Sequence, residues 1–290
     1  MLALGRSIDT SAQDEGVFLV PDDSLATSGA LADDIRALTA EEQEAAQIPQ
    51  VTLSEILYTA SVLVKHRNCP VDVVNSILAF SAHFLTFQQE ISELHHGRNN
   101  MNDEYVRLDL PKADELALPS GVAVSKCVFL VADCVSKDQG WASFEHELNG
   151  TYNGSYTWSE VAVKKPVAHT TVEGPDNAEN DTAAVAVKEE VARVCVCSNL
   201  RAHRRFRHHR KCFQDPSGVI QHIELGDSVT LILRSLYPGW SNTAKYGKLT
   251  ACFALEFDED FSSAAIPFPA DAAQRSASGA GGSKPACAIQ

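Results

Sequence analysis

The chain has 290 residues, a formal net charge of −14, 44% hydrophobic and 21% charged residues, a composition typical of a globular protein with a sizeable core. It holds no apolar run of about 18 residues and no apolar leader, so we expect neither a membrane-spanning helix nor a secreted product. The eight cysteines are scattered without a CxxC pair, which argues against a disulfide framework or a zinc site and indicates reduced thiols in a cytosolic protein.

The negative charge is concentrated at the N-terminus. Residues 1–50 hold ten acidic and two basic side chains with little apolar periodicity, and we predict a disordered acidic segment there. Farther along, residues 101–163 carry ten acidic against four basic side chains, whereas residues 191–257 carry four against ten. If these two stretches pack together, their charges can neutralise each other.

Residues 51–98 are predicted to form a helical hairpin. Thr52 and Glu55 have the spacing of a capping box at the start of the first helix. Asn68-Cys69-Pro70 ends that helix, and apolar side chains at helical spacing then extend the second helix to about His95. This hairpin precedes the main domain.

From residue 104 the sequence indicates short β-strands. Apolar and β-branched stretches alternate with turn signals, and no helical pattern separates them. We therefore predict an antiparallel β-sandwich over residues 104–257. Residues 164–190 are polar and acidic and are expected to form a long surface loop, and residues 258–290 are expected to form a flexible tail.

Aromatic and turn-forming side chains gather in three motifs, at residues 138–158, 225–229 and 237–242. In one interpretation they are architectural, with turn residues and with indoles that cap the ends of the core. In the other, they form a rim of exposed rings and amides that binds a saccharide or a peptide. The candidate ligand-binding residues are Asp138, Trp141, Tyr152, Trp158, Trp240 and Asn242.

These motifs resemble a mainly fungal family of uncharacterised proteins with the pattern DQGW…GTYxGSxTW…GDxI…YPGWxN. The resemblance covers about residues 104–257, with Tyr156 in place of the usual tryptophan and Ser159 in place of the usual aromatic residue. It implies a galactose-binding-like or discoidin-like sandwich of jelly-roll type and no established chemistry. A weak resemblance of residues 69–84 to an F-box helix implies an alternative role as a substrate adaptor of a ubiquitin ligase. The segments that carry the main resemblance are EYVRL (104–108), SKDQGW (136–141), GTYNGSYTW (150–158), LGDSVTL (225–231) and YPGWSN (237–242).

The last four residues, Cys287-Ala288-Ile289-Gln290, have the C-a-a-X pattern of farnesylated proteins. One lipid chain binds a membrane only marginally, so stable anchoring usually needs a second signal. Our main hypothesis is a non-enzymatic binding or scaffold protein, cytoplasmic and tethered to membrane surfaces through a farnesylated Cys287. We predict no cofactor, catalytic residue or metal site, because the sequence lacks the usual motifs for them.

A basic run, RAHRRFRHHRKC, occupies residues 201–212. As a strand it carries charge on both faces, which favours an edge strand that is solvated or paired with residues 101–163. Contact with an anionic membrane is the second alternative, since it would support the lipid anchor, and nucleic acid is the least favoured partner. The side chains assigned to that contact are Arg201, Arg204, Arg205, Arg207, Arg210 and Lys211.

Overall fold

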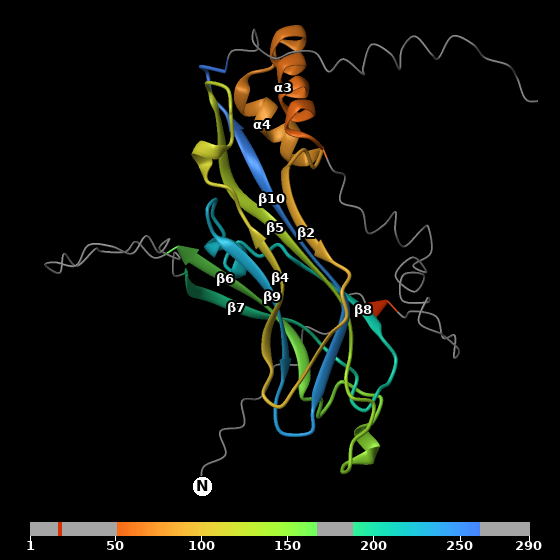
Figure 1. Ribbon diagram of the computed structural model, residues 1–290. Helices are drawn as coiled ribbons and strands as arrows, with labels where there is room; N and C mark the ends of the chain where they lie inside the picture. The colour runs from red at the N-terminus through yellow and green to blue at the C-terminus, as the bar shows by residue number, and fades with distance from the viewer. Residues whose placement is uncertain (1–16, 19–50, 167–187, 262–290) are drawn as a thin grey trace, which may run out of the picture. The chain divides into compact units, whose positions relative to one another are not determined.

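The computed structural model describes residues 17–18, 51–166 and 188–261 (Figure 1). Helices α3 (Leu53–Arg67) and α4 (Val71–Phe80) precede two antiparallel β-sheets, which confirms the mainly β fold class. Most of the segments 1–50 and 258–290, predicted to be disordered and flexible, lie outside the described residues.

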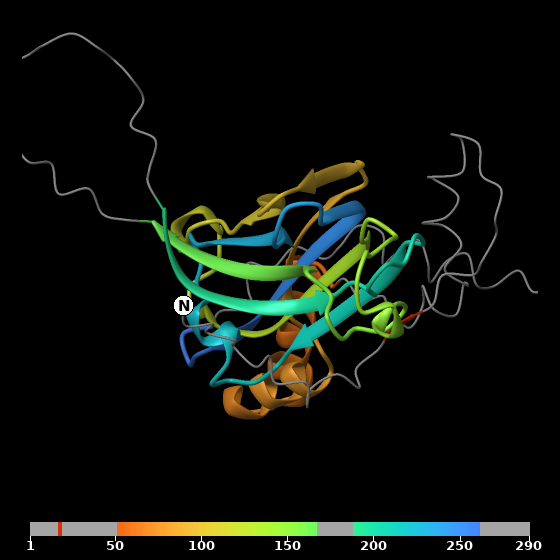
Figure 2. The same ribbon diagram turned by 90° about the horizontal axis from the view of Figure 1, so that it is seen from below.

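Among the described residues, one sheet has six strands in the order β1-β8-β5-β10-β2, with β3 paired to β10, and the other has four in the order β4-β9-β6-β7 (Figure 2). In the first sheet the strands are β1 (Val17–Phe18), β2 (Leu85–Ile91), β3 (His95–Arg98), β5 (Val122–Lys137), β8 (Arg207–Phe213) and β10 (Ser241–Phe257). In the second they are β4 (Asn102–Asp109), β6 (Thr157–Pro166), β7 (Lys188–Ser198) and β9 (Ser228–Ser235).

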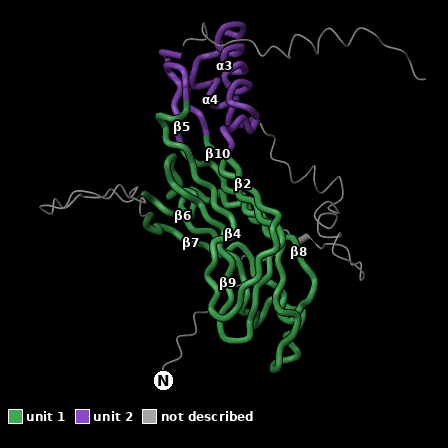
Figure 3. The backbone as a smooth tube through the Cα atoms, in the orientation of Figure 1, with its two compact units in different colours: residues 1–48, 87–116, 126–253 green, residues 49–86, 117–125, 254–290 purple. Residues whose placement is uncertain are grey.

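The chain divides into two compact units (Figure 3). The described part of unit 1, residues 17–18, 87–116, 126–166 and 188–253, holds the four-stranded sheet and most of the six-stranded sheet. The described part of unit 2 holds both helices and consists of residues 51–86, 117–125 and 254–261.

Helix α3 begins as the sequence predicts. The Glu55 amide donates to Thr52 Oγ1 over 3.2 Å, and the Thr52 amide donates to Glu55 Oε2 over 2.8 Å, which completes the capping box. Within unit 2, the Asn75 side chain of α4 bonds both backbone groups of Phe257, at 3.0 Å to the carbonyl and 2.9 Å from the amide. These bonds fasten α4 to the end of β10.

The predicted helical hairpin over residues 51–98 is too long. Helix α4 ends at Phe80, where Ala82 takes a left-handed φ of 54°, and residues 85–91 and 95–98 form β2 and β3. Leu85 is buried, and the ring of Phe87 packs edge-on against Phe253 with centroids 5.8 Å apart. The apolar residues that suggested a helix here therefore belong to a strand. The sheet region begins at residue 85 instead of 104.

The connection between β6 and β7 is shorter at both ends than the surface loop predicted over residues 164–190. Strand β6 continues to Pro166 and β7 begins at Lys188, while residues 167–187 lie outside the described part. Lys164 is paired with Glu190, and Lys165 with Glu189, across the two strands. Opposite charges at facing positions stabilise a strand pair, so polar residues extend the sheet here.

Within unit 1 the two sheets pack against each other closely. At Gly247 of β10, a Cβ atom would lie only 2.7 Å from Val106 Cγ2 and 2.9 Å from Tyr105 Cε1 of β4. Any side chain at this position would push the sheets apart, so the glycine permits the contact.

A buried network of side-chain amides joins the sheets. Asn199 Nδ2, just after β7, donates to Thr157 Oγ1 of β6 (3.2 Å) and to Asn242 Oδ1 of β10 (3.0 Å). Asn199 Oδ1 accepts from Ser136 Oγ of β5 over 2.7 Å, and Asn242 Nδ2 donates to the carbonyls of Trp158 and Arg234. None of the four hydrogen-bonding side chains is more than 2% exposed. The network therefore fixes the register of one sheet against the other.

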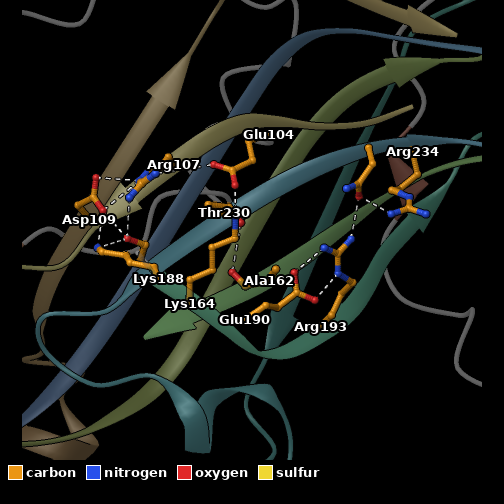
Figure 4. A network of polar contacts seen from close by, with 12 residues as sticks. Glu104, Arg107, Asp109, Ala162, Lys164, Lys188, Glu190, Arg193, Thr230 and Arg234 are labelled. Atoms are coloured by element: carbon orange, nitrogen blue, oxygen red, sulfur yellow. Dashed lines mark hydrogen bonds and ion pairs between the residues drawn. The ribbon is translucent and has the colours of Figure 1, made fainter. Parts of the chain in front are cut away.

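The four-stranded sheet carries a set of ion pairs (Figure 4). Glu160 lies in the range 101–163, and both Arg193 and Arg234 lie in the range 191–257. Glu160 accepts from Arg193 Nη1 over 2.9 Å and lies 3.7 Å from Arg234 Nε. Asp109 pairs with Lys188, and Glu104 with Lys164. The expected neutralisation between residues 101–163 and 191–257 is thus confirmed at Glu160.

Asn199→Ala should lower the free energy of unfolding by about 2–4 kcal/mol, because it leaves several buried polar groups without a hydrogen bond. Urea denaturation measures this change. Asn149→Ala, at an exposed amide, is the control and should shift stability by less than about 0.5 kcal/mol. Equal effects of the two substitutions would contradict the role given to the network.

Candidate functional site

The structure divides the basic run into a loop and a strand. Only Arg207–Phe213 forms β8, because the preceding residues turn at Ala202, whose φ is 54°. Strand β8 pairs with β5 on one side and with the two residues of β1 on the other. It is therefore the next strand in from the edge among the described residues.

Arg210 and His208 hydrogen bond to the buried carboxylate of Asp133, which lies in the range 101–163. Arg210 donates to both oxygens of Asp133, at 2.8 and 3.0 Å, and His208 Nε2 hydrogen bonds to Asp133 Oδ1 over 2.8 Å. Burial acts to raise the pKa of Asp133, but these bonds outweigh burial and hold the pKa below its ordinary value. Burial also lowers the pKa of the neighbouring His209 to about 4, so this side chain is neutral at pH 7. Internal pairing of the run is confirmed at Arg210.

Arg201 is buried completely and cannot contact a membrane, which corrects the sequence prediction. Its guanidinium donates to the carbonyls of Gly154 and Phe144, each over 2.6 Å. The same group lies over the Phe144 ring at 4.8 Å and the Trp240 ring at 5.5 Å. Arg201 thus holds loops together. Of the other predicted contacts, Arg204 and Arg205 are exposed, and Arg207, Arg210 and Lys211 are half-buried.

Asp138 binds backbone amides of two loops and is 2% exposed. Its carboxylate accepts from Gly140 (2.7 Å), Ala202 (2.6 Å) and His203 (2.9 Å). Burial raises its pKa to about 6, even though these amides and nearby Arg201 act to lower the pKa. Asp138 therefore fastens residues 138–140 to residues 202–203, and the prediction that it contacts a ligand is wrong.

Most of the other predicted ligand-binding residues also serve the architecture. Trp240 is 6% exposed and packs edge-on against Tyr156 at 5.0 Å, and Asn242 belongs to the buried amide network. The indole of Trp158 donates to Glu160 over 2.8 Å, and Tyr152 is half-buried. For Trp240 and Asn242 the prediction of ligand contact is wrong, because solvent does not reach them.

Three aromatic side chains on these loops are exposed to solvent: Trp141 by 55%, Phe144 by 47% and Tyr237 by 50%. We call them the aromatic loop face. The sequence predicts Trp141 but not the other two. Both lie within the motifs at residues 138–158 and 237–242, but Tyr237 precedes a Pro-Gly pair that signals only a turn, and nothing in the sequence singles out Phe144.

A chain of ring contacts connects this face to the core. Arg201 lies over both Phe144 and Trp240, and Tyr156 packs edge-on against Trp240 and Tyr237, each at 5.0 Å. Hydrogen bonds between side chains and the backbone hold the loops as well. Gln139 donates to the Trp141 carbonyl, and the Tyr237 amide donates to Asn100. The rings of Phe144 and Tyr237 therefore stand on fixed supports, and at Trp141 a hydrogen bond holds the backbone.

The described residues form no group of three or more histidine, cysteine or acidic side chains that could hold a metal ion. Neither α3 nor α4, the helices in the described part of the chain, is long and apolar enough to cross a membrane. What these loops offer chemically is ring surface and hydrogen bonds.

Comparisons with known proteins give little similarity. Neither family models nor curated proteins match the chain. A solved structure of Eiger TNF from S. frugiperda aligns with 62% of this chain and 98% of its own, at 7% identity and a TM-score of 0.30. Similarity at this level carries no argument about function.

The raised pKa of Asp138 predicts how stability depends on pH. Between about pH 4 and 6 the Asp138 carboxyl is protonated in the folded chain but largely ionised in the unfolded chain. Acidification through this window therefore stabilises the fold. From pH 7 to 4.5, wild type should gain stability over Asp138→Asn by at most about 2 kcal/mol. Denaturant unfolding of both proteins across this range measures the difference. A stability difference that is constant with pH would contradict the prediction.

Proposed function

We propose that the chain is a non-enzymatic binding module whose ligand contacts the aromatic loop face. The observation that carries this proposal is the exposure of Trp141, Phe144 and Tyr237 by about half each, on loops that hydrogen bonds hold in place. Rigid aromatic side chains give large contact areas at a low cost in conformational entropy. Such a face is better suited to binding than to catalysis.

A saccharide is the ligand class that we favour. The faces of sugar rings are apolar and stack on aromatic side chains, while their hydroxyls need hydrogen-bonding partners at the rim. Exposed polar side chains lie beside two of the rings: Glu145 follows Phe144 in the sequence, and Arg204 donates to the carbonyl of Gly140, the residue before Trp141, over 3.4 Å. The resemblance to galactose-binding-like sandwiches agrees with this ligand class.

Trp141→Ala combined with Tyr237→Ala should weaken saccharide binding by about tenfold or more, because the substitutions remove two stacking surfaces. A glycan array identifies the saccharide, and isothermal titration measures the affinity. Val191→Ala on β7 removes another exposed apolar side chain and should leave binding unchanged. An array without any bound glycan would refute the saccharide assignment.

A second proposal concerns the place where the module works. The CAIQ ending supports a cytoplasmic protein held at membrane surfaces by a farnesyl group on Cys287, a residue outside the described part. An exposed apolar stripe on α4, formed by Val73, Ile77 and Phe80, favours contact with a membrane or another partner further. The adaptor alternative stays a prediction, since α4 lies within residues 69–84 and a protein partner would contact the same stripe.

Cys287→Ser should abolish farnesylation and move the protein from the membrane fraction toward the soluble fraction of eukaryotic cells. The reason is that the thioether to the lipid forms only at this cysteine. Intact mass of the native protein reports the lipid directly, and fractionation reports its effect. A native mass without the lipid, or equal fractionation of the variant and the parent, would exclude the anchor.

A further inference from the structure

Strand β8 continues beyond the short strand that borders it. Strand β5 pairs with all seven residues of β8, whereas β1, red in Figure 1, pairs only with His208 and His209. Within the described part of the chain, residues 211–213 of β8 therefore meet a strand on one side and none on the other. A strand edge of this kind readily accepts another extended segment. We call residues 211–213 the open edge of β8.

The two strands next to this edge carry an excess of positive charge. Strands β5 and β8 together hold five lysine and arginine side chains and a single carboxylate, that of Asp133. Asp133 is already bonded to Arg210 and His208. Lys211 forms no ion pair with any described residue, and its ammonium lies over the Phe213 ring at 5.6 Å. An acidic strand would therefore fit the open edge best.

The register of β1 shows which residues could reach the open edge. Val17 faces His209 and the strands are antiparallel, so each step toward the N-terminus of the chain moves one residue farther along β8. Continued without a break, this register gives three further facing pairs: Gly16 with Arg210, Glu15 with Lys211, and Asp14 with Cys212.

The charges of these pairs match position by position. Glu15 would face Lys211, and opposite charges at facing positions stabilise a strand pair. Gly16 would face Arg210, whose guanidinium already has a carboxylate partner in Asp133 and needs no second one. The acidic residue thus falls where the described residues supply no carboxylate.

We propose that residues 13–16 extend β1 along the open edge of β8, so that the chain's own acidic N-terminal segment is the partner of the basic run. Residues 1–50 hold ten acidic and two basic side chains, which is the sign of charge that the edge needs. Because β1 already fastens this segment to β8, its effective concentration at the edge exceeds that of a separate acidic molecule. This inference goes beyond the proposed function and depends on neither a saccharide nor a lipid.

Disulfide trapping tests the register in the full chain. Asp14→Cys places a thiol opposite the native Cys212, and facing residues of antiparallel strands have Cα atoms about 4.5–5.5 Å apart, within the reach of a disulfide. Glutathione disulfide oxidises the two thiols and is itself reduced to glutathione. Peptide mapping without reductant should then find residue 14 linked to Cys212 within one chain.

Gln13→Cys and Glu15→Cys are the matched controls for this trapping. Successive side chains of a strand point to opposite faces, so both of these cysteines would point away from Cys212. In the proposed strand they should link to Cys212 at least about tenfold less than Asp14→Cys does.

Charge reversal tests the pairing of Glu15 with Lys211. Glu15→Lys should speed hydrogen exchange at amides of residues 211–213 by about threefold or more, because two positive charges would then face each other. Lys211→Glu should act in the same direction, and the two reversals combined should restore the exchange of the parent. Asp9→Lys makes the same change of charge outside the proposed strand and should leave this exchange unchanged.

Three results would overturn the inference. One is linking to Cys212 that is absent, or equal for cysteines at positions 13, 14 and 15, since no register would then hold the segment. Another is linking between two chains only, because the edge would then accept the segment of a second copy. The third is a combined variant whose exchange stays as fast as that of the single reversals.

Discussion

The short segment from Asn199 to His203 fastens together the parts of unit 1 on which the rest depends. Its first residue joins the two sheets through a buried amide, its third satisfies two loop carbonyls with a buried guanidinium, and its last two donate to Asp138. A buried polar group without a partner is costly, so the loss of one of these contacts would destabilise the others. The segment therefore sets both the packing of the sheets and the position of the loops.

This arrangement explains why several polar side chains of the loops are not available to a ligand. The polar side chains with the most specific geometry, Asp138, Arg201 and Asn242, are consumed in positioning the backbone. The ring area of Trp141, Phe144 and Tyr237 remains at the surface, together with exposed polar side chains such as Glu145. The buried polar groups thus serve the structure, and the binding that we propose would fall to the exposed rings.

The sequence predicted the fold class, the capping box and most strands, because these follow from local spacing. It misjudged residues 85–98, where a few apolar residues fit a helix or a strand equally well and packing on Phe253 decides. It could not reveal the burial of Arg201, since a charged side chain gives no local sign that carbonyls 47 and 57 residues away will receive it. Nor could it show the exposure of Phe80, which depends on what the rest of unit 2 covers.

The internal engagement of the basic run also changes how the protein responds to ionic strength. A protein that reaches an anionic surface through a free polybasic patch is attracted over a Debye length and released by salt. Here Arg201 is buried, Arg210 is paired with Asp133, and the whole chain carries a net charge of −14. At long range the dominant force toward a negative surface is therefore repulsion, which added salt screens. Moderate salt would therefore weaken this repulsion, whereas it would weaken the attraction of a free polybasic patch.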